Sequence, residues 1–273
     1  MAWIILLIVG FVGGTVGSIA GLGGGIVIVP SLLFLETSLG VISNMGPQII
    51  VGTSYLVLIA TGLSSTIAYM KQKKVDFNSG FIFFIGSGPG AIVGALINRF
   101  FETDQFAGVF GLLMIGISLL MFFTKSIKPI GIIKTGKLHT YTDENGMSWE
   151  YKYSTILAII ICFFIGILSG LFGIGGGSLL VPIMLLLFGF PTAVAIPTSM
   201  FIVFLSGITG SVTHVSLGNV HWLYALALIP GAWFGARFGA YLNRKLNEKV
   251  VVTIFRLILI IIGFRMVINA IIG

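Results

Sequence analysis

The chain has 273 residues, of which 57% are hydrophobic and 8% are charged, and its net charge is +7. So few charged residues cannot cover a water-facing surface, which excludes a soluble globular protein. The positive charge does not indicate a nucleic-acid partner, because the Lys and Arg residues lie in short segments between apolar runs, as they do in membrane proteins. The composition therefore predicts an integral membrane protein embedded in a lipid bilayer.

Apolar segments that are long enough to cross a bilayer follow one another along the chain. We expect helices, because a helix satisfies its own backbone groups in lipid. Each half of the chain should form a helical hairpin and three spans: 3–20 and 26–40, then 47–70, 79–99 and 105–123; and 155–172 and 176–190, then 193–215, 222–242 and 249–271. The predicted class is an all-α integral membrane protein with eight to ten membrane helices.

Two details concern the first segment and the covalent structure. The first apolar segment lacks the basic start and the small-residue cleavage site of a signal peptide, so we expect it as a helix of the mature protein. The single cysteine, Cys162, lies inside an apolar span, which excludes an internal disulfide.

One long polar segment, residues 124–154, divides the chain. Its stretch HTYTDENGMSWEY places a Gly-containing turn between two alternating runs, which predicts a small solvated β-hairpin. We therefore expect a first transmembrane repeat over 1–125, a cytoplasmic loop with the β-hairpin over 126–152, and a second transmembrane repeat over 153–273.

A glycine-rich motif occurs twice. Residues 21–30 read GLGGGIVIVP, and residues 173–182, which lie 152 positions later, read GIGGGSLLVP. Further along, the spacing becomes 145 positions, which pairs Thr53-Ser54 with Thr198-Ser199. Glycines at every fourth position within 86–94 and 231–239 also align, and such stripes predict close helix packing.

The charges of aligned loops indicate how the two halves are oriented. Loop 71–74 reads KQKK, whereas the aligned loop 216–219 reads SLGN and carries no charge. Opposite charge in equivalent loops favours two inverted repeats, with both termini outside and the 124–154 loop in the cytoplasm. An alternative count, with eight helices in a parallel repeat and both termini inside, stays open.

The doubled G-x-G-G-G-x-x-x-x-P motif after an apolar helix, with the later Thr-Ser pairs and spans ending in Asn-Arg, resembles the TauE/SafE family, also called toluene-sulfonate uptake permeases. The resemblance covers both repeats and leaves out the 124–154 loop. It implies a multi-pass transporter of the bacterial cytoplasmic membrane that moves sulfite, sulfonates or other small organic anions, commonly outward. Members of the family differ in substrate, so the resemblance implies a class of ligand.

A carrier of small anions must replace the hydration of its substrate inside the membrane. Helix N-termini can do this, because they offer free N–H groups and a partial positive charge. The consecutive glycines are expected to break each hairpin, so that two facing tips bind the anion near the bilayer midplane. Gly52 and Pro197 are expected to interrupt the next spans, each just before a Thr-Ser pair. The predicted substrate-binding residues are Gly23, Gly24, Gly25, Thr53, Ser54, Gly175, Gly176, Gly177, Ser178, Thr198 and Ser199.

Each of these features has a purely structural alternative. The consecutive glycines can serve close packing, and the hydroxyls can bond the preceding turn of their own helix. Arg237 and Arg256 either extend toward the membrane surface or line a basic vestibule. Glu36 is expected at the membrane interface, and His214 and His221 in a solvated loop, with a proton-coupling role as the alternative for all three.

The motifs of several other protein classes are missing from the sequence. There is no H-E-x-x-H motif or Cys/His cluster, so we expect no metal and no cofactor. Ser206 and His214 lie eight residues apart on one predicted helix, about 12 Å of rise, which is too far for a nucleophile and its base, and we expect no enzyme. An anion channel and a non-transporting scaffold stay as alternatives. The identity of the anion, the direction of transport, proton or sodium coupling and a homo-oligomer are left open.

Overall fold

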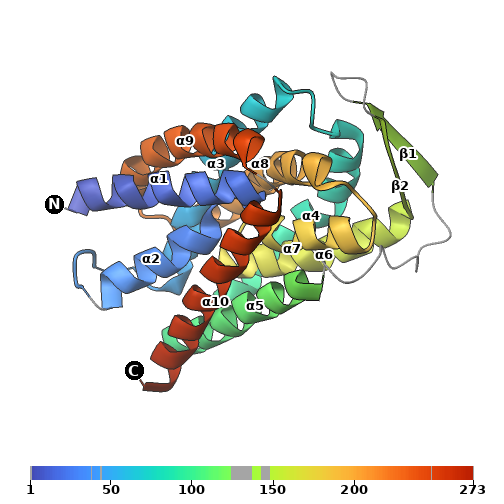
Figure 1. The fold of residues 1–273 in the computed structure, drawn as a ribbon. Helices are drawn as coiled ribbons and strands as arrows, with labels where there is room; N and C mark the ends of the chain where they lie inside the picture. Colours follow the sequence, from blue (N-terminus) through green and yellow to red (C-terminus); the bar gives the residue numbers. More distant parts are fainter. Residues whose placement is uncertain are drawn as a thin grey trace.

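The computed structural model describes residues 2–37, 39–43, 45–123, 137–142, 148–246 and 248–272. These residues form ten helices and one two-stranded antiparallel sheet (Figure 1). The elements are α1 (Ala2–Ala20), α2 (Gly25–Thr37), α3 (Pro47–Met70), α4 (Phe77–Asn98), α5 (Thr103–Phe123), β1 (Lys137–Thr142), β2 (Ser148–Tyr153), α6 (Thr155–Phe172), α7 (Gly177–Leu186), α8 (Thr192–Ser216), α9 (Trp222–Lys245) and α10 (Glu248–Ile272).

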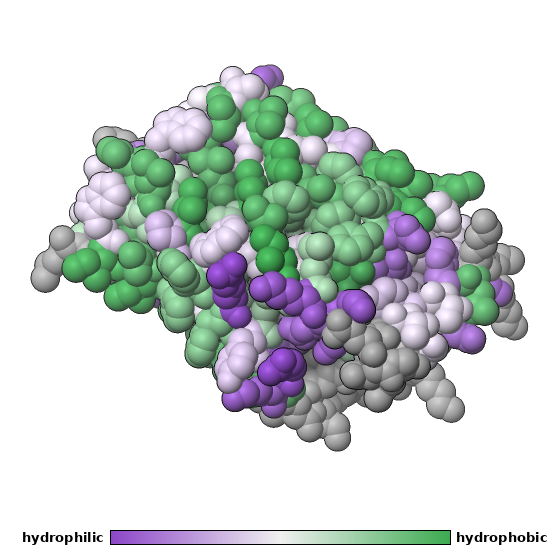
Figure 2. Space-filling view, turned by 90° about the horizontal axis from the view of Figure 1, so that it is seen from above, coloured by the Kyte–Doolittle hydropathy of each residue, from purple (hydrophilic) through white to green (hydrophobic). Residues whose placement is uncertain are grey.

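The all-α membrane class that composition predicts is confirmed. Five helices, α1, α3, α4, α6 and α8, are long and apolar enough to cross a bilayer. The hairpin helices α2 and α7 are shorter. Figure 2 shows apolar atoms over much of one face of the molecule, with hydrophilic residues gathered toward the end that carries the two strands. This surface suits a protein that is surrounded by lipid rather than water.

Helix α1 lies along α9, and the two helices run in the same direction (Figure 1). A Cβ atom built on Gly231, Gly235 or Gly239 would lie 2.1–2.4 Å from a carbonyl oxygen of α1. These oxygens belong, in the same order, to Leu7, Phe11 and Thr15. The glycine stripe therefore brings two backbones into direct contact, as predicted.

The equivalent pair in the other half, α4 and α6, packs in the same way. Cβ atoms on Gly86, Gly90 and Gly94 would lie 2.0–2.2 Å from successive carbonyl oxygens of α6. In each pair, an asparagine near the end of one helix also donates a hydrogen bond to the other helix. Asn98 Nδ2 donates to the Leu171 carbonyl, and Asn243 Nδ2 donates to the Ile19 carbonyl, both at 2.6 Å.

Helices α3 and α8 cross at the centre of the molecule and run in opposite directions. A Cβ on Gly62 would lie 2.7 Å from the Phe204 nitrogen, while a Cβ on Gly210 would lie 2.1 Å from the Tyr55 ring. Later residues of α3 thus contact earlier residues of α8, as expected for antiparallel helices.

The expected interruptions of these two helices are wrong. Both α3 and α8 continue unbroken through Gly52 and Pro197. Pro197 is the sixth residue of α8, beyond the four N–H groups that have no partner within a helix, so it removes one bond of the ladder, yet α8 continues through it. Gly52 instead allows a close approach, because a Cβ there would lie 1.8 Å from the Asn219 carbonyl oxygen.

Strands β1 and β2 pair from Lys137 with Tyr153 to Thr142 with Ser148. The hairpin lies at one end of the molecule and the two termini at the other (Figure 1). It is attached to the start of α4, where the Tyr151 hydroxyl donates to Asp76 and the hydroxyls of Ser79 and Tyr153 lie 2.8 Å apart. Burial raises the pKa of Tyr153 to about 12, and burial together with the Asp76 carboxylate raises the pKa of Tyr151, so both phenols stay protonated.

Candidate functional site

The two glycine-rich tips share one backbone conformation. Three glycines in each tip have φ between +70° and +92°, a region that L side chains rarely adopt. They are Gly21, Gly23 and Gly24 in the first tip and Gly173, Gly175 and Gly176 in the second. Helices α2 and α7 begin directly afterwards, at Gly25 and Gly177. The motif thus turns the chain and starts a new helix whose first N–H groups have no acceptor within that helix.

The tips lie against each other. A Cβ on Gly25 would lie 2.0 Å from the Gly173 carbonyl oxygen, and a Cβ on Gly177 would lie 2.2 Å from the Gly21 carbonyl oxygen. The last glycine of the motif, at its fifth position, therefore allows the two tips to touch through their backbones in both halves. The same two carbonyls accept hydrogen bonds from α3 and α8: Ser54 Oγ donates to the Gly173 carbonyl at 3.1 Å, and Ser199 Oγ donates to the Gly21 carbonyl at 2.8 Å.

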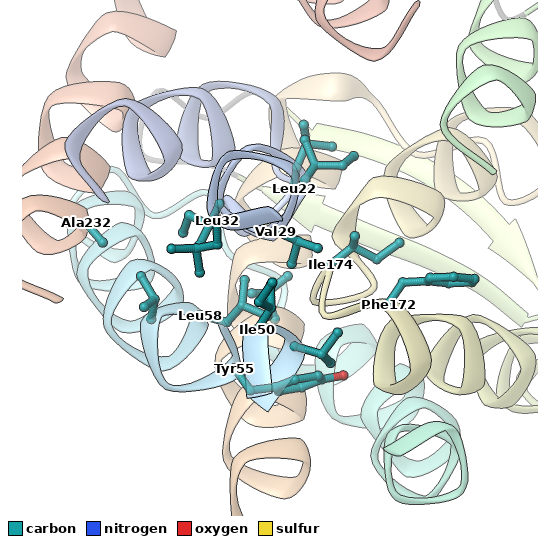
Figure 3. Packing of buried hydrophobic residues seen from close by; sticks show 14 of the residues in the cluster. Leu22, Val29, Leu32, Ile50, Tyr55, Leu58, Phe172, Ile174 and Ala232 are labelled. Carbon is teal, nitrogen blue, oxygen red and sulfur yellow. The ribbon is translucent and has the colours of Figure 1, made fainter. Parts of the chain in front are cut away.

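Two apolar side chains cover the middle of both tips. Cβ atoms on Gly23 and Gly175 would each lie 2.7–3.2 Å from methyl groups of both Leu58 and Val203. Leu58 and Val203 occupy equivalent positions in the two halves, 145 residues apart. Figure 3 shows Leu58 within the buried cluster that also contains Leu22 and Ile174, one from each tip. Sequence reasoning missed this pair, because Leu and Val in a membrane helix carry no signal of their own.

The Thr-Ser pairs bind protein groups on both sides of the centre. Thr53 Oγ1 accepts from the backbone N–H of His221, and Thr198 Oγ1 accepts from that of Asp76, each at 3.0 Å. His221 and Asp76 are the N-cap residues of α9 and α4, so each threonine holds the start of a helix from the other half. The four hydroxyls fix the two halves together around the tips.

Three polar side chains near the second tip, those of Tyr55, Ser169 and Ser178, have apolar residues or glycine at the equivalent positions of the other half. The Ser178 Oγ, in the first turn of α7, is buried and has no hydrogen-bond partner among the described residues. The hydroxyls of Tyr55 and Ser169 lie 2.9 Å apart. A Cβ on Gly176 would lie 3.7 Å from Ser169 Oγ, which is ordinary contact, whereas one on Gly24 would lie 2.7 Å from the Gly13 carbonyl oxygen.

The prediction of a solvated loop for His214 is wrong. α8 extends to Ser216, and the His214 side chain is fully buried, with Nε2 3.3 Å from the Gly170 carbonyl oxygen. His221 is half-buried and its Nδ1 caps α9 by accepting from Tyr224 N at 3.4 Å. The alignment of the halves contained a signal for His214, since its equivalent, Tyr69, lies inside the predicted span 47–70.

The ionisable residues expected around the site lie in different places. Arg237 is exposed, and its guanidinium lies 5.6 Å from the centre of the Trp233 ring on the same helix. Arg256 is half-buried in α10, and its carbonyl accepts from Ser118 of α5 at 3.4 Å. Glu36 accepts from the Met45 backbone N–H at 2.7 Å and so closes the connection after α2.

The chemistry available at the tips is that of helix N-termini. The first N–H groups of a helix have no acceptor within it and carry a partial positive charge, so they suit an anion. The described residues contain no group of three His, Cys, Asp or Glu side chains that could hold a metal ion. The tips therefore offer backbone N–H groups and hydroxyls as ligand donors.

Comparisons with known proteins support a transport role. The family described as "Sulfite exporter TauE/SafE" matches residues 6–266. A protein of Bacillus subtilis named "Probable membrane transporter protein YunE" is 52% identical over 98% of both chains. A protein named "Probable membrane transporter protein" from Xylella fastidiosa is 27% identical over 94% of this chain and 92% of its own. No solved structure matches the chain.

Proposed function

The chain belongs to the sulfite exporter TauE/SafE family of multi-pass membrane transporters, and on that premise we propose that it is a secondary carrier of small organic or sulfur-containing anions such as sulfite or sulfonates. The observation that carries this proposal is the meeting of two helix N-termini, α2 and α7, at the buried centre of the protein. An oxyanion there would replace its hydration by backbone N–H groups.

We also propose that the two halves are inverted repeats. Helices α3 and α8 are equivalent in the two halves and run in opposite directions, as an inverted repeat requires. In such carriers the substrate binds where the repeats meet, which here is the contact between the tips. Leu58 and Val203, which cover both tips, would then have to move before an anion reaches the N–H groups.

The orientation can be tested with single cysteines in a Cys162→Ala background. A cysteine at Ser148, in the hairpin, should react with an impermeant thiol reagent from the cytoplasmic face, and one at Asn219 from the outside. Reaction of both from the same side would contradict the inverted arrangement and restore the parallel count of eight helices.

The binding site can be tested at Gly176. A Cβ there meets nothing closer than 3.6 Å, so Gly176→Ala adds one methyl group at the α7 N-terminus with little steric cost. Gly189→Ala is a matched control, because Gly189 has nearly the same φ, +68° against +70°, and open space around it. Both substitutions should cost a similar amount of stability through the positive φ, about 1–2 kcal/mol.

The measurement uses purified protein, first for thermal stabilisation by sulfite, ethanesulfonate and acetate, and then for flux in liposomes. A ligand that binds only the folded state raises its melting temperature. We expect stabilisation by a sulfur oxyanion and saturable flux, both of which Gly176→Ala loses and Gly189→Ala keeps. Unsaturable flux would favour an anion channel, and the absence of binding and flux would favour a scaffold.

A further inference from the structure

A cluster of buried polar side chains lies beside the second tip. The Tyr55 and Ser169 hydroxyls are 2.9 Å apart, and the centres of the Tyr55 and His214 rings are 5.3 Å apart. All three side chains are at most 1% exposed. The equivalent positions beside the first tip hold Met200, Gly17 and Tyr69. The cluster is therefore one of the places where the two halves differ.

This cluster adjoins the N-terminus of α7, a helix of 10 residues. A Cβ on Gly176, the N-cap residue, would lie 3.7 Å from Ser169 Oγ. Within the first turn, Ser178 Oγ is fully buried and finds no partner in the part of the chain that the structure describes. Buried polar groups in native proteins are normally satisfied, so an unpaired hydroxyl beside unpaired N–H groups indicates a ligand with acceptor oxygens.

The hydrogen bond of His214 fixes where a proton can be added. A carbonyl oxygen only accepts, so the Nε2 that faces the Gly170 carbonyl at 3.3 Å carries the hydrogen in the neutral ring. Nδ1 then holds a lone pair, and it is buried without a donor among the described residues. The ring is thus positioned to take up a proton at Nδ1.

The surroundings of the ring contain no balancing charge. The ring lies beside the Tyr55 ring of α3 and the Gly170 carbonyl of α6, both of which are uncharged. His221, the nearest other titratable group in sequence, stacks on Tyr224 of α9. Among the described residues, no carboxylate, Lys or Arg contacts the ring. An imidazolium would therefore be an unpaired buried charge until an anion arrives.

We infer that His214 takes up one proton at Nδ1 when an anion binds at the N-terminus of α7, so that the protein carries a small oxyanion together with a proton. The inference rests on the proposed carrier function and adds the coupling ion. The proton comes from solvent and is carried as the imidazolium, so a monoanion and its proton cross with no net charge. By linkage, the anion favours the proton as much as the proton favours the anion.

The test is calorimetric titration of the full-length protein with ethanesulfonate, which stays a monoanion throughout and, unlike sulfite, does not itself titrate near neutral pH. Repeating the titration in buffers of different ionisation enthalpy gives the number of protons taken up. We expect one proton per anion, with the dissociation constant rising about tenfold per pH unit between the pKa of His214 in the free protein and its pKa in the anion complex.

Three variants separate a coupling role from a structural one. His214→Gln keeps a donor for the Gly170 carbonyl but cannot take up a proton, so proton uptake should fall to zero and the remaining affinity should lose its pH dependence. His214→Tyr copies Tyr69 of the other half and serves if the first variant fails to fold. His221→Asn, the control, keeps a side chain that can cap α9 and should take up a proton as the unmodified protein does.

The outcomes distinguish this inference from the proposed function. If the unmodified protein binds ethanesulfonate without taking up a proton, or if His214→Gln still takes one up, the coupling is overturned while the carrier stands. If the unmodified protein binds neither ethanesulfonate nor sulfite and shows no flux, the proposed function fails and the coupling fails with it.

Discussion

The two glycine-rich tips have the same backbone but different surroundings. In the first tip, Gly24 packs tightly against the Gly13 carbonyl, and Ile26 follows in the first turn of α2. In the second tip, Gly176 has ordinary contacts only, and the equivalent of Ile26 is Ser178. The repeated motif forms two helix N-termini, and a hydroxyl side chain follows only the second of them in this position. The comparison teaches that repeated sequence fixes the geometry of a site, while the positions that break the repeat indicate its chemistry.

The largest effect is expected where the tips touch. Gly25→Ala and Gly177→Ala each place a Cβ about 2 Å from a backbone carbonyl oxygen of the other tip, which only a backbone shift can relieve. Each should destabilise the protein by about 3 kcal/mol, seen as a large fall in melting temperature. If only one of the two substitutions is costly, the tips do not meet in the symmetric way described.

A smaller effect should separate the tips. Gly24→Ala adds a Cβ 2.7 Å from the Gly13 carbonyl oxygen, in addition to the strain of positive φ that Gly176→Ala also carries. We expect Gly24→Ala to melt at a lower temperature, by about 1–2 kcal/mol more than Gly176→Ala. Equal melting temperatures for the two variants would contradict the tight contact between Gly24 and the Gly13 carbonyl.

Ser178→Ala tests the polar character of the second tip. Because the hydroxyl has no partner among the described residues, its removal should leave ligand-free melting unchanged or slightly raised. Affinity for ethanesulfonate should fall by about five- to thirtyfold, which corresponds to about 1–2 kcal/mol. An unchanged affinity, measured by calorimetry, would place the anion away from this hydroxyl.

The smallest effect is expected away from both tips, at Arg237. The side chain is exposed and its guanidinium lies against Trp233, so Arg237→Lys should change flux less than twofold. A large loss of flux with normal yield would support a basic vestibule instead.

The helices could be predicted from sequence because their length and apolar composition are set by the bilayer. The helix predicted over 3–20 is observed as Ala2–Ala20, and the helix predicted over 47–70 is observed as Pro47–Met70. Predictions from single residues were wrong where contacts between helices determine the structure. Pro197 and Gly52 suggested interruptions, but α3 and α8 support each other along their length, so both stay continuous. The place of His214 depends on its contact with Tyr55, which lies 159 positions earlier in the chain.

The β-hairpin contacts the start of α4, and the equivalent start of α9 has no counterpart of it among the described residues. Its tyrosines bind Asp76 and Ser79 at the start of α4, whereas α9, the equivalent helix, starts at His221 without such a partner among the described residues. A carrier built from two identical inverted halves would have inward-open and outward-open forms of equal free energy. Here the hairpin bonds the start of α4 and also packs on Phe188 and Phe190, which follow α7, and we expect these contacts to set the resting state of the proposed carrier. Replacing Tyr151 and Tyr153 with Phe should then change which membrane face admits a thiol reagent to a cysteine at Ser178, without changing the anion that is bound.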